Sequence, residues 1–209
     1  MDSQEFLDKI EEEKETELDR LGSTKGLMAA TNGDIDLDTV LETAVAAEHR
    51  AAKTFSCWSS SEEGEAGRVF GEVAVVEREH QEKVESLVDD EIEPEGIDDL
   101  HEYLRGVEDT VERVAAGMVG RGLVSDAALK QTVSFFTGQA ARKKADRFRE
   151  LREENEDIVE KGLNLLDSVC DDDEDWERAT EAAGKTVDVY YDDYVESCEE
   201  IGVNPKPVC

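Results

Sequence analysis

Glu77 and His80 lie three residues apart in a segment that carries a regular stripe of apolar residues. Residues three apart share one face of a helix, so the carboxylate and the imidazole are both expected to point into the protein. A Glu-x-x-His pair that points into a helical bundle is a repeating unit of di-iron and di-manganese carboxylate sites. The alternative is a polar pair at the rim of a bundle, or one that is hydrogen-bonded in its core. The stripe has helical spacing and consists of Val69, Phe70, Val73, Val76, Val84 and Leu87.

A second carboxylate, Glu48, lies in the middle of the apolar stripe of the preceding helical segment, residues 43–55. The pattern therefore predicts an inward-facing glutamate, a short turn, and an inward-facing Glu-x-x-His on the returning helix. This is half of the carboxylate–histidine set that four-helix bundles use to hold a metal pair. Because burying a carboxylate without a partner costs several kcal/mol, something is expected to neutralise this half-site.

These two segments together resemble the first half of a rubrerythrin, a protein of the ferritin-like superfamily. The resemblance rests on Ala47-Glu48, on the small residues that follow Arg50, and on Phe70 with Glu77-x-x-His80 seven residues later. It implies an all-α fold, a ferritin-like antiparallel four-helix bundle, with oxygen or peroxide chemistry at non-haem iron or manganese. Glu48, Glu77 and His80 match the family's ligands position by position, whereas Glu108 matches only by its place in the third core helix.

The second half of the chain departs from the family pattern. The count from Phe70 to Glu77 and His80, repeated from Phe136, reaches Lys143 and Asp146. This half therefore lacks the second Glu-x-x-His, and a complete di-iron site needs both halves. Any remaining metal site is expected to be mononuclear or weak.

Lys143 is the candidate substitute for a metal ion. We expect its ammonium group to reach the carboxylates of Glu48, Glu77 or Glu108, since buried charges require pairing. In that case no metal would bind. The alternative is that Lys143 belongs to a solvated basic face over residues 141–152.

Two functions from different classes follow. The first is a peroxidase-like, non-haem metal oxidoreductase of oxidative stress with an incomplete site. It would need an external electron donor, because the sequence has no Cys-x-x-Cys pair for a rubredoxin-type iron site. The second is a metal-free bundle that acts as a binding or regulatory module, which the lost half-site and the extra helices favour. We place the metal function first. The sequence does not decide whether the protein forms a homodimer.

Charge dominates the composition, with 55 acidic against 23 basic residues, a formal net charge of −32 and a pI near 4.2. Apolar residues still make up 38% of the chain and recur at helical spacing, which favours folding over disorder. Acidity spread over every helix is typical of a protein kept soluble in concentrated salt, where charges are screened over about 3 Å at 1 M. The sequence therefore indicates a halophile and excludes direct binding to nucleic-acid phosphates, which needs a basic stripe.

The sequence shows no apolar run of membrane-spanning length and no signal peptide, so we expect a cytoplasmic protein without a membrane partner. Its four cysteines are widely spaced, which argues against a disulfide framework.

The periodicity divides the chain into an N-terminal helix and loop (1–37), the four-helix bundle (38–170), and a C-terminal helix and tail packed on it (171–209). An acidic linker over residues 89–96 is expected to cross the bundle. The third core helix is expected over residues 98–119, ended by Gly117, Gly120 and Gly122. The fourth is expected to begin near Ser125 and to continue through the Phe136 and Lys143 region.

Overall fold

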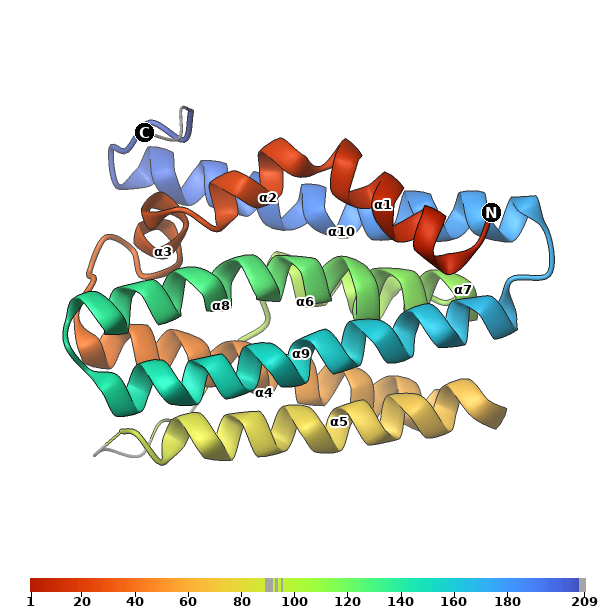
Figure 1. Ribbon diagram of the computed structural model, residues 1–209, viewed down its shortest axis with the longest axis horizontal. Coiled ribbons are helices and arrows are strands. Elements are labelled where there is room, and N and C mark those ends of the chain that lie inside the picture. The colour runs from red at the N-terminus through yellow and green to blue at the C-terminus, as the bar shows by residue number, and fades with distance from the viewer. Residues whose placement is uncertain (89–91, 93, 95, 207–209) are drawn as a thin grey trace.

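The computed structural model describes residues 1–88, 92, 94 and 96–206, and all regular secondary structure in these ranges is helical. The all-α prediction is confirmed. Four long helices, α4, α5, α8 and α9, lie lengthwise beside one another, and α10 runs along the far side of α8 (Figure 1). Most of the linker expected over residues 89–96, and Cys209 in the tail, lie outside the described residues.

A tight helical hairpin forms the first half of this arrangement. Helix α4 (Leu37–Ser61) is followed after two residues by α5 (Gly64–Glu85), as the apolar stripes predict. Gly64 has a positive φ of 71°, which lets the chain reverse between the two helices. Near this turn the rings of Phe55, Trp58 and Phe70 pack against one another with centroids 5.3 to 6.1 Å apart.

The expected third core helix is interrupted and then runs much further than predicted. Its first part is α6 (Asp99–Gly106), and the chain then leaves helical geometry before α7 (Thr110–Arg113). From there it continues without a break through the π-helical segment η1 (Val114–Gly120) into α8 (Arg121–Gly138). The prediction that glycines end this helix near residue 119 is wrong.

These glycines serve close packing instead of helix termination. A Cβ atom on Gly117 would lie 2.3 Å from the Trp58 ring, and one on Gly120 would lie 2.8 Å from the Ala183 carbonyl oxygen. A Cβ atom on Gly122 would lie 2.4 Å from a methyl group of Val159. The helix can approach three neighbours here only because side chains are missing.

The expected fourth core helix is two helices. The chain reverses at residues 139–141, where Ala140 has a positive φ of 56°, and α9 (Arg142–Val169) returns beside α8. Phe136 and Lys143 therefore lie on different helices, and the residue count that linked them as one helix does not hold.

The terminal helices pack along one side of the molecule (Figure 1). The N-terminal segment forms α1 (Ser3–Glu13), α2 (Glu15–Leu21) and α3 (Thr24–Ala30). The C-terminal segment is α10 (Asp173–Glu200), whose Trp176 packs on Phe6 of α1 with ring centroids 5.9 Å apart. Both residues belong to the same apolar core as Phe55 and Phe70.

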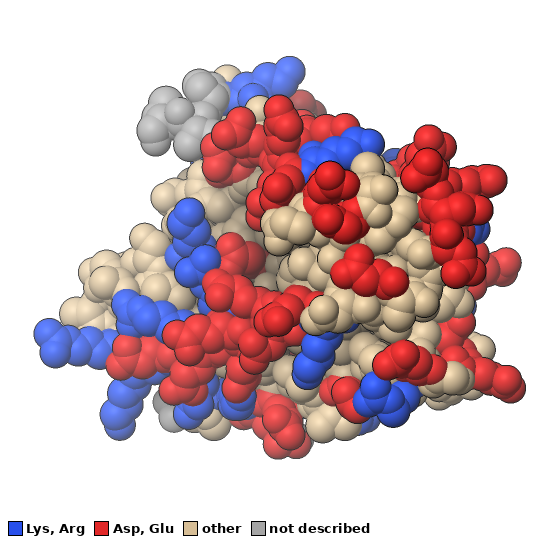
Figure 2. Space-filling model, turned by 45° about the vertical axis from the view of Figure 1, so that its right-hand side comes forward, with Lys and Arg blue, Asp and Glu red and all other residues tan. Residues whose placement is uncertain are grey.

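Carboxylate side chains cover much of the face seen in Figure 2, with lysines and arginines among them. No helix among the described residues is both long and apolar enough to span a bilayer.

Candidate metal centre

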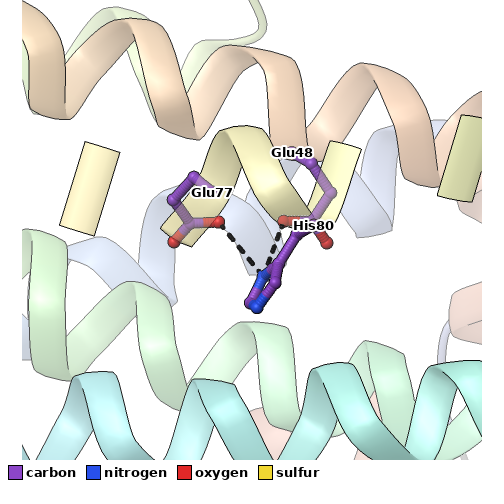
Figure 3. A group of neighbouring side chains, drawn as sticks. All are labelled: Glu48, Glu77 and His80. Atoms are coloured by element: carbon purple, nitrogen blue, oxygen red, sulfur yellow. Dashed lines mark ion pairs between the residues drawn. The ribbon is translucent and has the colours of Figure 1, made fainter. Parts of the chain in front are cut away.

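Glu48, Glu77 and His80 converge between α4 and α5 (Figure 3). One ligand atom from each lies within 4.8 Å of the other two. The Nδ1 atom of His80 is 3.5 Å from Oε2 of Glu48 and 3.7 Å from Oε2 of Glu77. The side chains of Glu77 and His80 are only 1% and 3% exposed, and that of Glu48 is 12% exposed. The sequence therefore identified three side chains that the fold brings together.

These separations fit ligands around one ion better than they fit hydrogen bonds. N–H···O hydrogen bonds have donor–acceptor distances of about 2.7 to 3.2 Å. Both distances from Nδ1 of His80 to the glutamate oxygens are longer than this. A tetrahedral ion with bonds of about 2.1 Å separates neighbouring ligand atoms by about 3.4 Å. The Nδ1 atom of His80 thus lies from each of the two carboxylate oxygens at about the separation of neighbouring ligands.

The other ring nitrogen of His80 is held by a carboxylate from α9. His80 Nε2 lies 2.8 Å from Oε2 of Glu154, and Lys83 Nζ donates to both Glu154 oxygens at 2.5 and 2.6 Å. If Nε2 carries the proton that Glu154 accepts, Nδ1 presents its lone pair to the two glutamates. Metal-binding histidines have this arrangement, in which a carboxylate fixes the tautomer and the ring orientation.

Arg121, the first residue of α8, forms an ion pair with Oε1 of Glu77 and leaves Oε2 facing His80. It is buried, its guanidinium lies 5.4 Å from the centroid of the Phe55 ring, and its NH1 atom donates to Ser125 Oγ at 3.3 Å. The Arg121 guanidinium is therefore the buried cation beside the half-site.

The π-helical segment positions this arginine. In an α-helix the backbone N–H of Arg121 would bond the carbonyl of Gly117, four residues earlier. It bonds the carbonyl of Ala116 instead, and the side-chain Nε of Arg121 donates to the Gly117 oxygen at 3.3 Å. Single π-helical turns inside α-helices are frequent at functional sites.

Burial and charge shift the pKa values of the cluster in opposite directions. Burial raises the pKa of Glu48 to about 7. Burial alone would also raise the pKa of Glu77, but the Arg121 guanidinium and His80 lower it to about 2. Burial alone would lower the pKa of His80, but the Glu48 and Glu77 carboxylates raise it to about 10. Without a metal ion, a protonated His80 therefore supplies the positive charge between the two carboxylates.

Two other predicted site residues lie elsewhere. Glu108 is exposed in the non-helical segment between α6 and α7, because the third core helix is interrupted there. Lys143 is exposed on the first turn of α9, because the chain reverses just before it. The expectation that Lys143 is the buried cation is wrong; Arg121 has that place.

Arg121 and Glu154 were not among the predicted site residues. Arg121 is the only charged residue in the apolar and glycine run of residues 114–124, which is a signal that it is buried. The glycines of that run favour a helix end instead, which hides this signal. Glu154 gave no such signal, since it lies within a dense series of acidic and basic residues on α9.

Comparison with protein-family models, with curated proteins and with solved structures gave no match.

Proposed function

We propose that Glu48, Glu77 and His80 bind one divalent first-row metal ion, iron or manganese, in a rubrerythrin-like protein of the ferritin-like type. The observation that carries the proposal is the dual contact of His80. One ring nitrogen bonds a carboxylate, and the other faces two carboxylate oxygens at the separation of ligand atoms. Two carboxylates and an imidazole are ligands that suit both Mn²⁺ and Fe²⁺.

Arg121 limits the proposed site to a single ion. Its guanidinium is bonded directly to Glu77 and is buried, so a second dication on that side would meet a fixed positive charge. Three protein ligands leave coordination positions open, and the ion would supply there a redox-active Lewis acid for oxygen or peroxide. Electrons for turnover would come from a separate donor protein.

A second candidate function rests on Arg121 and His80. Arg121 and a protonated His80 neutralise the two glutamates without any metal, so the cluster is also complete as a buried ion network. In that case the protein is a metal-free bundle that acts as a binding or regulatory module.

Titration with Mn²⁺ in molar KCl separates the two functions. The proposed site predicts one bound ion per chain, detected by electron paramagnetic resonance and by elemental analysis after desalting. Glu77→Gln is expected to weaken Mn²⁺ binding at least tenfold.

Glu154→Gln is expected to weaken Mn²⁺ binding by about 10- to 100-fold, as loss of a carboxylate behind a ligand histidine does. Glu79→Gln is the matched control, because Glu79 is exposed on the same helix. Absence of binding to the wild-type protein, or equal binding by Glu77→Gln and Glu79→Gln, would rule out the metal function.

A further inference from the structure

A cavity of about 120 Å³ lies between α3, α4, α8 and α10 and borders the half-site. Its walls include exposed residues, so it opens at the surface, and Asp193 is one of them. Its polar groups include Glu48 and Ser125, the residue that accepts a hydrogen bond from Arg121. Most of the wall is apolar and includes Leu27, Val40, Ala44, Ala128, Leu129 and Phe148.

Glu48 connects this cavity with the proposed metal site. It lines the cavity and also lies 3.5 Å from His80. Its side chain is 12% exposed, whereas those of Glu77 and His80 are almost fully buried. A molecule in the cavity would therefore meet the cluster on its Glu48 side.

The size of the cavity limits its occupant to a small molecule. An apolar cavity of about 150 Å³ in another protein binds benzene. The cavity here is slightly smaller, but it opens to the surface, so a single six-membered ring can enter it. Apolar pockets with a few convergent polar groups are the usual form of small-molecule sites.

Charge argues against an ionic occupant. One divalent ion, the carboxylates of Glu48 and Glu77, and the Arg121 guanidinium together have a formal charge of +1. This positive charge does not favour a cation in the cavity. The apolar wall and the acidic Asp193 among the residues that line the cavity do not favour an anion. An uncharged molecule avoids both penalties.

We propose that this cavity binds a small uncharged molecule with a single apolar ring and one hydroxyl group, the chemical class of phenol. The ring lies against the apolar wall, and the hydroxyl group points to Glu48 and Ser125. This proposal deepens the proposed function, since the molecule would be held next to the bound ion. The fit of the ring depends only on the size and the apolar wall of the cavity.

Phenol itself is the probe, added to the folded protein in molar KCl and followed by NMR. Ring-current shifts are expected in the methyl signals of Val40 and Leu129. Ala128→Leu fills the cavity and is expected to weaken binding at least tenfold. Ala46→Leu, on α4 but not among the residues that line the cavity, is expected to leave binding unchanged. If Ala128→Leu does not fold, Ala44→Leu is used in its place, because Ala44 lines the cavity from α4 and Ala128 lines it from α8.

The same samples, with Mn²⁺ added, test proximity to the proposed metal site. Bound Mn²⁺ should increase the relaxation rates of the phenol protons, and Glu77→Gln should abolish the increase. Wild-type protein without methyl shifts would overturn the cavity proposal, even if Mn²⁺ binds. Unchanged binding in both filled variants, or tighter binding of benzylammonium than of phenol, would also overturn it. Methyl shifts without Mn²⁺ binding would support the cavity and reject the proposed metal function.

Discussion

The α4–α5 and α8–α9 hairpins meet at the same buried cluster but bring different chemistry to it. The first hairpin supplies Glu48, Glu77 and His80, each of which offers one atom that could bind a metal ion. The second supplies the Arg121 guanidinium and, on α9, the buried Asn155, whose amide donates to the Gly122 carbonyl oxygen at 2.9 Å. One half can therefore keep a ligand set while the other half supplies a fixed charge that stabilises it.

Charges from the second hairpin explain how the cluster can be buried. Two carboxylates of the first hairpin would be costly without a counter-charge. Arg121 provides it from the second hairpin, and Lys83 neutralises Glu154 at the rim. The charges of the two hairpins are complementary, so a substitution in one hairpin should change how much a substitution in the other alters the free energy of unfolding.

Loss of Arg121 is expected to have the largest effect. Arg121→Met leaves the Glu77 charge buried without its partner, which should lower the free energy of unfolding by about 3 to 5 kcal/mol. Urea unfolding in molar KCl measures this. The matched control is Arg68→Met on α5, whose exposed ion pairs should change stability by less than about 1 kcal/mol.

A double variant tests whether the two hairpins are coupled in this way. Arg121→Met with Glu77→Gln should be destabilised less than the sum of the two single variants, since neither charge is then left unpaired. If Arg121→Met were no more harmful than Arg68→Met, Arg121 would not be the counter-charge of the half-site.

Close approach of the two hairpins at Gly117 gives the next largest expected effect. Gly117→Ala places a Cβ atom 2.3 Å from the Trp58 ring, so the π-helical segment η1 or the ring has to move, at a cost of about 1 to 3 kcal/mol. Gly138→Ala is the control, because no atom lies within 4 Å of its added Cβ. Thermal unfolding should separate the two variants; equal melting temperatures would contradict the close packing.

Two buried histidines should report the opposite electrostatics of their surroundings. Glu48 and Glu77 raise the pKa of His80, as described above. Burial lowers the pKa of His101 on α6, where Asp98 opposes the shift and the Arg121 and Arg50 charges add to it. In metal-free protein at pH 7, side-chain NMR should therefore find His80 charged and His101 neutral. Both rings in the same state would contradict the assigned charges.

The two shifts predict opposite slopes of stability with pH. The contribution of His80 is fully present below pH 6.5 and is lost as pH rises through about 10, because its folded-state pKa is raised. The contribution of neutral His101 is lost as pH falls below 6.5, because the unfolded chain then takes up the proton first. Urea unfolding of His80→Gln and His101→Gln should flatten the alkaline and the acidic slope, respectively.

Lys143 is expected to give the smallest effect. Since Lys143 is exposed at the start of α9, Lys143→Ala should change the free energy of unfolding by no more than about 0.5 kcal/mol. Mn²⁺ content should not change either. A loss of several kcal/mol in the thermal melt would restore Lys143 as a partner of the buried carboxylates.

The first hairpin could be predicted from sequence because its signals are local. The apolar stripes of α4 and α5 fix which residues face inward, and Glu48, Glu77 and His80 follow from that spacing. The second hairpin could not be predicted in this way. Gly117 and Gly120 look like helix ends, yet they permit close packing against residues distant in the sequence, and only the fold shows that.

The buried cation was missed for a related reason. A count from Phe136 to Lys143 assumes one continuous helix, whereas the chain reverses at residues 139–141. The position of Arg121 depends on the π-helical turn before it, which shifts every later residue around the helix axis. Such a shift has no simple signature in the apolar pattern.

Crystals grown in molar KCl with Mn²⁺ offer the most direct test of the central claim, that one half of this cluster binds a single ion and the other half supplies a fixed cation. Anomalous scattering from manganese would locate each bound ion. We predict one peak between Glu48, Glu77 and His80, and none on the Arg121 side of Glu77. No peak at the three ligands, or a second peak beside Arg121, would contradict it.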